Sequence, residues 1–288
     1  MSVDIVITTY RNTDKLKVCL ESILEKTKFV DYKIYLWANE PNEEVKKVIH
    51  DSMYLDGILF NDRIEPIFSD NNDGSFSSNN NAEAKEGTGE YILFLNDDII
   101  TVHDSWLLNM KRILDTDQKV GTVGSLLLYP NGNIQHCGVF FSRKTNNLPF
   151  HMFYQKPIDA NIAKFISVPR YYQAVTAACM LVRRSDFEAL GGYDEKFFYG
   201  FEDTGLCLSM KSKLKKWSVF CPDSKLVHNE GISGTFKKHP KLQDNIKVLR
   251  DHYSGLFIDD YDMYLSNPNF MVYKYKQVEQ PPEEAEIE

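Results

Sequence analysis

Strand-like and helix-like segments alternate through the first third of the chain, and this order limits the possible folds more than any other feature. Four short apolar runs have the composition of buried strands: residues 3–8, 33–38, 64–68 and 91–95. Helical signals separate these runs, starting near Asn12 or Thr13 after the first one and covering residues 43–50 after the second. The alternation predicts a mixed, mostly parallel α/β sheet flanked by helices, with ligands at the carboxyl ends of the strands.

The second half of the chain has a mixed pattern. Predicted strands and helices lie on both sides of a hairpin signal at residues 130–133, and residues 146–170 show no clear period. The strands are expected at residues 120–129, 134–141, 175–183 and 217–221, and helical patterns at 185–188 and 202–213.

The length of 288 residues fits one enlarged domain better than two. We predict a single α/β domain over residues 1–235, with a nucleotide-binding half at 1–100 and an acceptor half at 101–235. Residues 236–276 are expected to form an extension packed on that domain. The acidic, proline-containing segment 277–288 is expected to be a disordered tail.

The charge balance argues against a nucleic-acid partner. The net charge is −8 and the sequence pI is about 5.5, so no broad basic surface is expected to face a phosphate backbone. The five cysteines are odd in number and widely spaced, which favours reduced thiols over a disulfide framework. Neither a signal peptide nor a transmembrane segment is expected, so we predict a cytoplasmic protein that can still contact a membrane surface peripherally.

Asn96, Asp97 and Asp98 follow directly on the apolar run at residues 91–95. Adjacent carboxylates repel each other, so a fold that places them at the end of a strand commonly supplies a cation. Carboxylate oxygens suit Mg²⁺ or Mn²⁺, which commonly bridge a diphosphate. The alternative is an Asp-rich turn that caps the next helix.

Glu202 and Asp203 stand at the start of a predicted helix, where carboxylates are stabilised by unpaired N–H groups. Helix capping is one interpretation, and a general base that takes a proton from an acceptor hydroxyl is the other. Their spacing does not choose which of the two would be the base. His228 follows a predicted strand, where a neutral imidazole can complete an Asp-based metal site or make an ordinary hydrogen bond.

Gly74 and Asn80 enclose a polar stretch before the run at residues 91–95. Glycine permits close backbone approach, and asparagine can cap the helix that follows. The stretch can therefore line a nucleotide or sugar pocket, or form a structural turn.

Taken in order, these segments resemble the family 2 glycosyltransferases of the GT-A fold. VDIVITTYRN is similar to that family's opening strand and first nucleotide-contacting loop, and YILFLNDDI to its metal-binding strand. GTVGSLLLYPNGNIQHCGVFF resembles the segment that follows in bacterial rhamnosyl- and related polysaccharide transferases. AVTAACMLVRRSDFEALGGYDEKFFYGFEDTGLCL resembles the acceptor-side block, and PDSKLVHNEGISG the block that ends in a metal-binding histidine.

The resemblance implies a role for each matching position. It implies that Asp98 and His228 bind Mn²⁺ or Mg²⁺, and that Asp203, with Glu202 beside it, is the general base. The residues implied to contact the nucleotide-sugar donor are Thr8, Thr9, Tyr10, Arg11, Asn39, Glu40, Gly74, Asn80, Asn96 and Asp97. The implied reaction is an inverting, metal-assisted displacement by a hexosyltransferase, from a UDP- or dTDP-type donor to a glycan, a glycolipid or another hydroxyl acceptor.

Two positions depart from the family pattern. Where the family often has an aspartate at the end of its second strand, this chain has Asn39 and Glu40, either of which can take its place. Where the helix after the acidic pair normally has another aspartate, this chain has Gly205. We expect the second departure to change acceptor contacts rather than abolish activity.

Two other classes of protein fit parts of the pattern. A sugar-nucleotide pyrophosphorylase would need a glycine-rich, basic loop after its first strand, and the sequence TTYRN has no glycine. A non-catalytic saccharide-binding module on the same fold would not need its catalytic residues. The presence of Asp98, Asp203 and His228 therefore favours the enzyme.

Overall fold

A computed structural model describes residues 2–70, 75–198, 200–230 and 240–275. Within these residues the main sheet has ten strands, eight of which form the continuous order β12-β14-β8-β13-β6-β1-β2-β5. In that order, the eight are β12 (Arg170–Tyr172), β14 (Trp217–His228), β8 (Val120–Leu128), β13 (Cys179–Arg183), β6 (Tyr91–Leu95), β1 (Val3–Thr9), β2 (Tyr32–Asn39) and β5 (Ile64–Ser69).

The sheet joins a parallel half to a mixed half. β5, β2, β1 and β6 are parallel, whereas β13 runs antiparallel to both β6 and β8, and β14 is parallel to β8. Two short strands, β7 (Ile99–Thr101) and β9 (Ile134–His136), pair antiparallel with β14 and β8. The mixed, mostly parallel α/β sheet expected from the sequence is confirmed.

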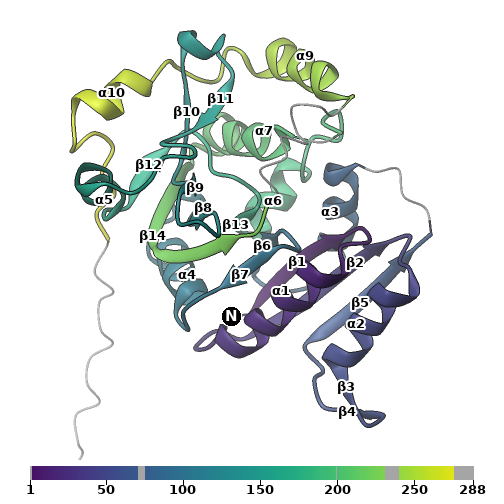
Figure 1. Cartoon of the computed structure of the whole chain (residues 1–288). Helices are drawn as coiled ribbons and strands as arrows, with labels where there is room; N and C mark the ends of the chain where they lie inside the picture. The colour runs from purple at the N-terminus through teal and green to yellow at the C-terminus, as the bar shows by residue number, and fades with distance from the viewer. Residues whose placement is uncertain (1, 71–74, 199, 231–239, 276–288) are drawn as a thin grey trace, which may run out of the picture.

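Helices cover both faces of this sheet (Figure 1). One core cluster packs α1 (Thr13–Lys26), α2 (Glu43–Met53) and α4 (Trp106–Thr116) on one face. A second cluster packs α3 (Phe76–Ala84), α6 (Arg184–Leu190) and α7 (Glu202–Ser209) on the other. Alternate residues of β6 divide between the clusters, with Leu93 in the first and Phe94 in the second, as expected for a strand buried on both faces.

Several predicted elements have different bounds in the structure. The strand expected over residues 175–183 begins only at Cys179, because the N–H of Ala177 bonds to the side chain of Asp203 instead of a neighbouring strand. The strand expected at residues 217–221 continues to His228, past an irregular register between Cys221 and Lys225. The helix after Glu202 ends in a π-helical turn at Met210–Leu214.

The segment at residues 146–170, which has no sequence period, contains regular structure. β11 (Pro149–His151) pairs antiparallel with β10 (Val139–Phe141), and α5 (Ala160–Ile166) follows. The remaining short elements are β3 (Tyr54–Leu55), β4 (Ile58–Leu59) and the 3₁₀ turn η1 (Arg143–Thr145).

The C-terminal segment packs on the end of the molecule opposite α2 (Figure 1). α9 (Leu242–Tyr253) joins a core cluster with Phe141 and Phe201, and α10 (Tyr261–Ser266) places Tyr264 against Tyr172. The division into a domain at 1–235 and an extension at 236–276 stays a prediction, and the predicted tail at 277–288 lies outside the described residues.

In the part of the chain that the structure describes, no helix combines the length and the apolar character that crossing a membrane requires. The cytoplasmic location stays a prediction.

A buried ion pair joins the parallel half of the sheet to α3 and α6. The guanidinium of Arg184 donates to the Asp4 carboxylate and to the carbonyls of Ala84 and Gly89, each at 2.6 Å. Asp4 also accepts the N–H of Gly89, whose position leaves no room for a side chain, since a Cβ there would lie 2.6 Å from Asp4 Oδ1. These contacts hold the start of β1 against the loop that leads into β6.

We expect Arg184→Met to lower the free energy of unfolding by about 3–5 kcal/mol, because it leaves the Asp4 carboxylate buried without its cation. Urea unfolding of the purified variant measures this loss. The matched control is Arg112→Met on exposed α4 surface, which should change the free energy of unfolding by less than about 0.5 kcal/mol. Equal effects of the two substitutions would contradict the role given to Arg184.

Glu83 of α3 is fully buried and bonds to two neighbouring strands. Its Oε1 accepts the N–H groups of Ile7 in β1 and Trp37 in β2, each at 3.0 Å, and its Oε2 accepts the Thr8 hydroxyl at 3.1 Å. Burial raises the pKa of Glu83 to about 8, although these three hydrogen bonds oppose the shift.

This pKa shift predicts a pH dependence of stability. Between about pH 4.5 and pH 8 the folded protein keeps a proton on Glu83 that the unfolded chain has released, so the free energy of unfolding falls as pH rises. Glu83→Gln should remove that part of the slope, because an amide carries no charge. Its oxygen can accept the same two N–H groups, while its NH₂ would donate to the Thr8 hydroxyl oxygen instead of accepting from it. Urea unfolding across this pH interval measures it, with exposed Glu86→Gln as control. An unchanged slope in Glu83→Gln would show that Glu83 does not titrate there.

Candidate active site

The loops that follow β1 and β6 meet at one edge of the sheet because these strands are parallel neighbours. Asp97, just after β6, accepts the hydroxyl proton of Thr9 at 2.6 Å and the Asn12 amide at 3.0 Å. Burial and the neighbouring charge of Asp98 raise the pKa of Asp97 to about 6, against the two hydrogen bonds. Asp97 therefore joins the two loops that the sequence predicts to contact a nucleotide.

Asp98 and His228 lie side by side although 130 positions of sequence separate them. Their strands are neighbours, because β7 begins directly after Asp98 and pairs with β14, with Ile99 opposite His228. Asp98 Oδ1 lies 2.9 Å from His228 Nε2, and the Lys15 ammonium lies 3.2 Å from Asp98 Oδ2. Burial acts to raise the pKa of Asp98, but His228 and Lys15 outweigh it and the pKa is lowered.

The two predicted metal ligands suit a small divalent ion. Asp98 supplies a carboxylate, the ligand type that Mg²⁺ and Mn²⁺ prefer, and a neutral His228 can add an imidazole nitrogen. In this structure the 2.9 Å between Asp98 Oδ1 and His228 Nε2 is an ion pair between the two groups. Within the described residues, no group of three or more His, Cys, Asp or Glu side chains is placed to hold a metal. Two protein ligands leave the other positions for water and substrate phosphate, as Mg²⁺ sites commonly do.

The acidic pair at the start of α7 follows a turn of left-handed backbone. Gly200 has φ 92° and Phe201 has φ 70°, a conformation that costs a non-glycine residue about 1 kcal/mol or more. Packing of the Phe201 ring in the cluster with Phe141 and Leu249 offsets that cost. The turn directs Glu202 and Asp203 into different environments.

Glu202 is buried, and its Oε2 has no hydrogen-bond partner among the described residues. Burial and the neighbouring Asp203 raise the pKa of Glu202, which favours the protonated acid. Asp203 is less buried and accepts the Ala177 N–H on Oδ2 at 3.1 Å. Its Oδ1 accepts both the N–H and the hydroxyl of Thr204, so Oδ2 keeps the capacity for one further hydrogen bond.

Residues Ala177 and Ala178 connect the acidic pair to the aspartates after β6. The N–H of Ala177 bonds to Asp203, and the carbonyl of Ala178 accepts the N–H of Asn96 at 3.1 Å. Asn96 also approaches His228, with its amide nitrogen 3.4 Å from Nε2. The three predicted motifs therefore meet at one place.

Other predicted donor-contacting residues divide by where their side chains point. Tyr10 and Arg11 lie exposed beyond β1, and Glu40 is half-buried beyond β2. Arg11 pairs with Glu40 at 3.5 Å and stacks on the Tyr10 ring. In contrast, the predicted polar residues Thr8, Asn39 and Asn80 bond to Glu83, Trp37 and the Phe76 carbonyl respectively. Gly74 lies outside the described residues. All these assignments stay predictions.

Asn12 and Lys15 also lie at this edge, but the sequence analysis did not predict them as site residues. Asn12 occupies the N-cap position of α1, yet its side chain bonds to Asp97 instead of capping the helix. Lys15 lies on the first turn of the same helix and reaches Asp98. Because Asn12 and Lys15 are three positions apart, they lie on one face of the helix. That spacing was the sequence signal that could have pointed to them.

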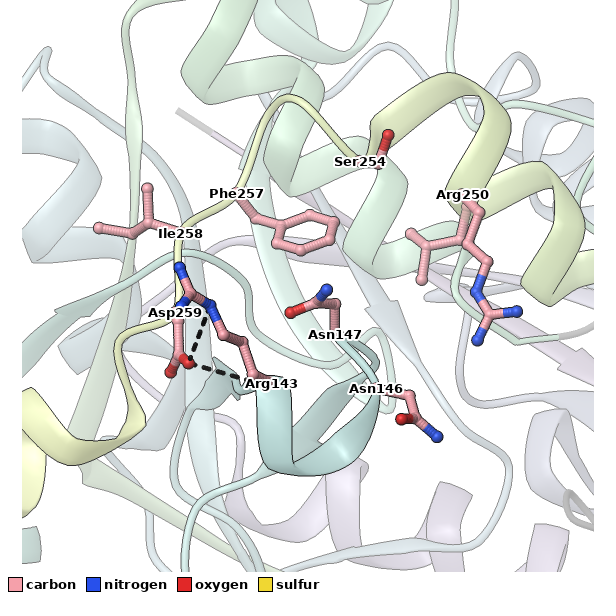
Figure 2. Close-up of a pocket in the computed structure, with 9 residues that line it drawn as sticks. Arg143, Asn146, Asn147, Arg250, Ser254, Phe257, Ile258 and Asp259 are labelled. Carbon is pink, nitrogen blue, oxygen red and sulfur yellow. Dashed lines mark hydrogen bonds and ion pairs between the residues drawn. The ribbon is translucent and has the colours of Figure 1, made fainter.

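A separate pocket of about 510 Å³ lies where η1 and the turn after it face the segment that follows α9 (Figure 2). Its lining combines Arg143, Arg250 and the amides of Asn146 and Asn147 with the ring of Phe257. The Arg143 N–H bonds to Asp259 on the same rim, and Phe257 stacks on Phe141. The pocket thus lies between residues 143–147 and the segment at 249–259.

Comparison with known proteins defines the class of this fold and site. The chain superposes on the crystal structure of GalNAc-T7 with UDP, GalNAc and Mn²⁺ with a TM-score of 0.66, over 87% of this chain and 48% of that one, at 15% identity. This likeness confirms the GT-A fold. The family model described as "Glycosyl transferase family 2" matches residues 4–191. The chain belongs to that family, which confirms the enzyme class expected from the sequence, a glycosyltransferase.

Two named relatives are bacterial. The chain is 29% identical over 234 residues to the O-antigen biosynthesis protein RfbC of Myxococcus xanthus, covering 80% of this chain and 17% of RfbC. It is 31% identical over 84 residues to the N-acetylglucosaminyl-diphospho-decaprenol L-rhamnosyltransferase of Mycobacterium tuberculosis, covering 29% of this chain and 25% of that protein. The chain thus spans a quarter or less of either protein, and the likeness supports the expected resemblance to bacterial polysaccharide-type transferases.

Gly205, where the family pattern has an aspartate, faces the rings of Phe197 and Tyr253. A Cβ at this position would lie 2.8 Å from Phe197 and 3.3 Å from Tyr253. We expect Gly205→Ala to lower the free energy of unfolding by about 1–3 kcal/mol through overpacking. The control Gly255→Ala meets no atom within 4 Å and should have little effect. Thermal unfolding of both variants checks this, and equal stability would show that α7 shifts to accommodate a side chain.

Proposed function

We propose that this protein transfers a sugar from a nucleoside-diphosphate sugar to a hydroxyl group, with inversion at the anomeric carbon. The observation that carries the proposal is the link through Ala177 and Ala178, which brings Asp203 to the edge that holds Asp97, Asp98 and His228. A carboxylate with the capacity for one more hydrogen bond then lies near the proposed place of the diphosphate and its cation. That arrangement suits direct displacement by an acceptor hydroxyl.

The donor would lie across the ends of β1, β2 and β6. Tyr10 and Arg11 offer a ring and a guanidinium for the base and ribose, and Asp97 is held rigidly by Thr9 and Asn12. Asn39 or Glu40 would complete the pocket at the end of β2. A UDP- or dTDP-type donor is the proposal made from the family resemblance.

Asp98 and His228 would hold Mn²⁺ or Mg²⁺, because a carboxylate and an imidazole lie side by side at this edge of the sheet. The Mn²⁺ bound with UDP in the GalNAc-T7 structure favours manganese. When bound, the ion would neutralise charge on the departing nucleoside diphosphate. The Lys15 ammonium, which now pairs with Asp98, is placed to contribute positive charge at the same position.

Asp203 is proposed as the general base and Glu202 as a neutral neighbour. The free capacity of Asp203 Oδ2 can accept the acceptor hydroxyl, whose proton it would take as the new glycosidic bond forms. Glu202, held protonated by burial, avoids a second negative charge beside the base.

The acceptor is proposed to be a glycan or glycolipid of a bacterial polysaccharide. The support is the likeness to the O-antigen biosynthesis protein RfbC and to a rhamnosyltransferase whose name specifies a lipid diphosphate acceptor. The pocket between η1 and α9 is proposed to contact a part of the acceptor remote from the reacting hydroxyl.

A donor-hydrolysis screen with UDP-, dTDP- and GDP-sugars, with and without Mn²⁺, tests the function. We expect the wild type to release one nucleoside diphosphate only with metal. Asp203→Asn should lower turnover by about 10²-fold or more and keep donor binding, whereas Asp98→Asn should weaken metal-linked binding. Exposed Asp51→Asn is the carboxylate control.

Calorimetry on the same proteins separates binding from turnover. Metal-linked binding of a nucleoside diphosphate that depends on Asp98 would support the proposed site. If the wild type binds none of the three nucleoside diphosphates with metal, the transferase proposal is wrong for this chain.

A further inference from the structure

Two histidines that the proposed mechanism does not use lie beside the site. His136 ends β9 and His151 ends β11, and their rings pack edge to face with centroids 4.8 Å apart at 77°. His136 is fully buried, and neither of its ring nitrogens has a hydrogen-bond partner among the described residues. Buried polar atoms without partners are uncommon and call for an explanation.

The tautomer of His151 follows from its one hydrogen bond. Nδ1 lies 2.8 Å from the backbone carbonyl of Gln135, which can only accept, so Nδ1 carries the proton. Burial lowers the pKa of His151, although the hydrogen bond and the charges of Asp203 and Glu230 oppose the shift. The ring is therefore neutral near pH 7, and Nε2 presents a lone pair that no described residue occupies.

The strand register places His151 near Asp203. His151 pairs with Val139 across β10 and β11, and the N–H of Val139 bonds to the Ala174 carbonyl. The chain from Ala174 then leads to Ala177, whose N–H holds Asp203. The electrostatic influence of Asp203 on His151 agrees with this proximity.

The wall around His151 is built from fixed polar and aromatic groups. Gln135 donates to Glu230 at 3.5 Å, while its carbonyl oxygen Oε1 is buried without a partner among the described residues. The Tyr154 ring packs edge to face on His151, and its hydroxyl accepts from Tyr129 at 3.0 Å. Such a mixture of aromatic faces and fixed hydrogen-bonding groups is typical of a surface that recognises a small polar ligand.

We propose that His151 is an acceptor-positioning residue, whose Nε2 accepts a hydrogen bond from a hydroxyl of the acceptor sugar next to the hydroxyl that Asp203 deprotonates. His136 holds the His151 ring in this orientation by its edge-to-face contact. The proposal rests on the proposed transferase function and narrows its acceptor to a saccharide with a free hydroxyl donor at that position. A metal role for the pair is disfavoured, since the described residues provide no cluster of three metal-binding side chains.

Long-range ¹H–¹⁵N NMR of the imidazole rings tests the tautomer without any substrate. We expect a neutral His151 protonated on Nδ1, with its resonances assigned by their absence from His151→Asn. An Nε2–H tautomer or a charged ring near pH 7 would overturn the proposal, because neither offers a lone pair at Nε2.

Kinetics then tests the role in positioning with two complementary substitutions. The amide of His151→Asn can keep the bond to the Gln135 carbonyl but removes the acceptor at Nε2, whereas His151→Gln can place an amide oxygen near Nε2. We expect His151→Asn to raise the KM for methyl glycoside acceptors on the order of 10-fold, with partial rescue in His151→Gln. Donor hydrolysis without acceptor should stay within about 2-fold of wild type, as should all parameters of exposed His50→Asn.

The outcomes distinguish this inference from the proposed function. A wild type that neither binds nor turns over any donor overturns the transferase proposal and, with it, the role of His151. With donor hydrolysis intact, an unchanged acceptor KM in His151→Asn would overturn the positioning role alone. If His151→Asn raises the acceptor KM, slows donor hydrolysis and lowers the melting temperature together, His151 has a structural role. That result would also overturn the positioning role.

Discussion

The buried contact between Arg184 and Asp4 determines how the two halves of the sheet meet. Arg184 begins α6 directly after β13, and Asp4 lies near the start of β1. Because the same guanidinium also binds the carbonyls of Ala84 and Gly89, it fixes the end of α3 and the entry to β6. The opposite ends of β1 and β6 carry Thr9 and Asp97, whose hydrogen bond requires these strands to keep their register.

The antiparallel strand β13 brings residues from the second half of the chain next to the proposed site residues of the first half. It lies between β6 and β8, so the residues preceding it arrive beside the end of β6. There the N–H of Ala177 and the carbonyl of Ala178 serve Asp203 and Asn96 instead of a strand partner. The shortened strand therefore follows from the contacts that Ala177 and Ala178 make with Asp203 and Asn96.

The sequence predicted the parallel strands and the positions of the acidic motifs well, because both are local signals. Asp97 and Asp98 follow an unmistakable apolar run, and parallel neighbours bring their loops together. The contacts of Lys15 and His151 could not be predicted, because they depend on how distant strands pair. The late start of this strand at Cys179 could not be predicted for the same reason, since residues 175–178 still fit the pattern of a buried strand.

The charges around this site limit which ligands it can bind. Asp98 is already paired with His228 and Lys15, whereas burial keeps Glu202 on the side of the neutral acid. A nucleoside diphosphate would add further negative charge beside Asp97, which already has a raised pKa. One lysine cannot balance that charge in a partly buried site, so the proposed function requires that donor and divalent cation bind together. If His151 contacts the acceptor as proposed, the neutral rings of His136 and His151 would suit recognition of uncharged sugar hydroxyls next to the proposed base.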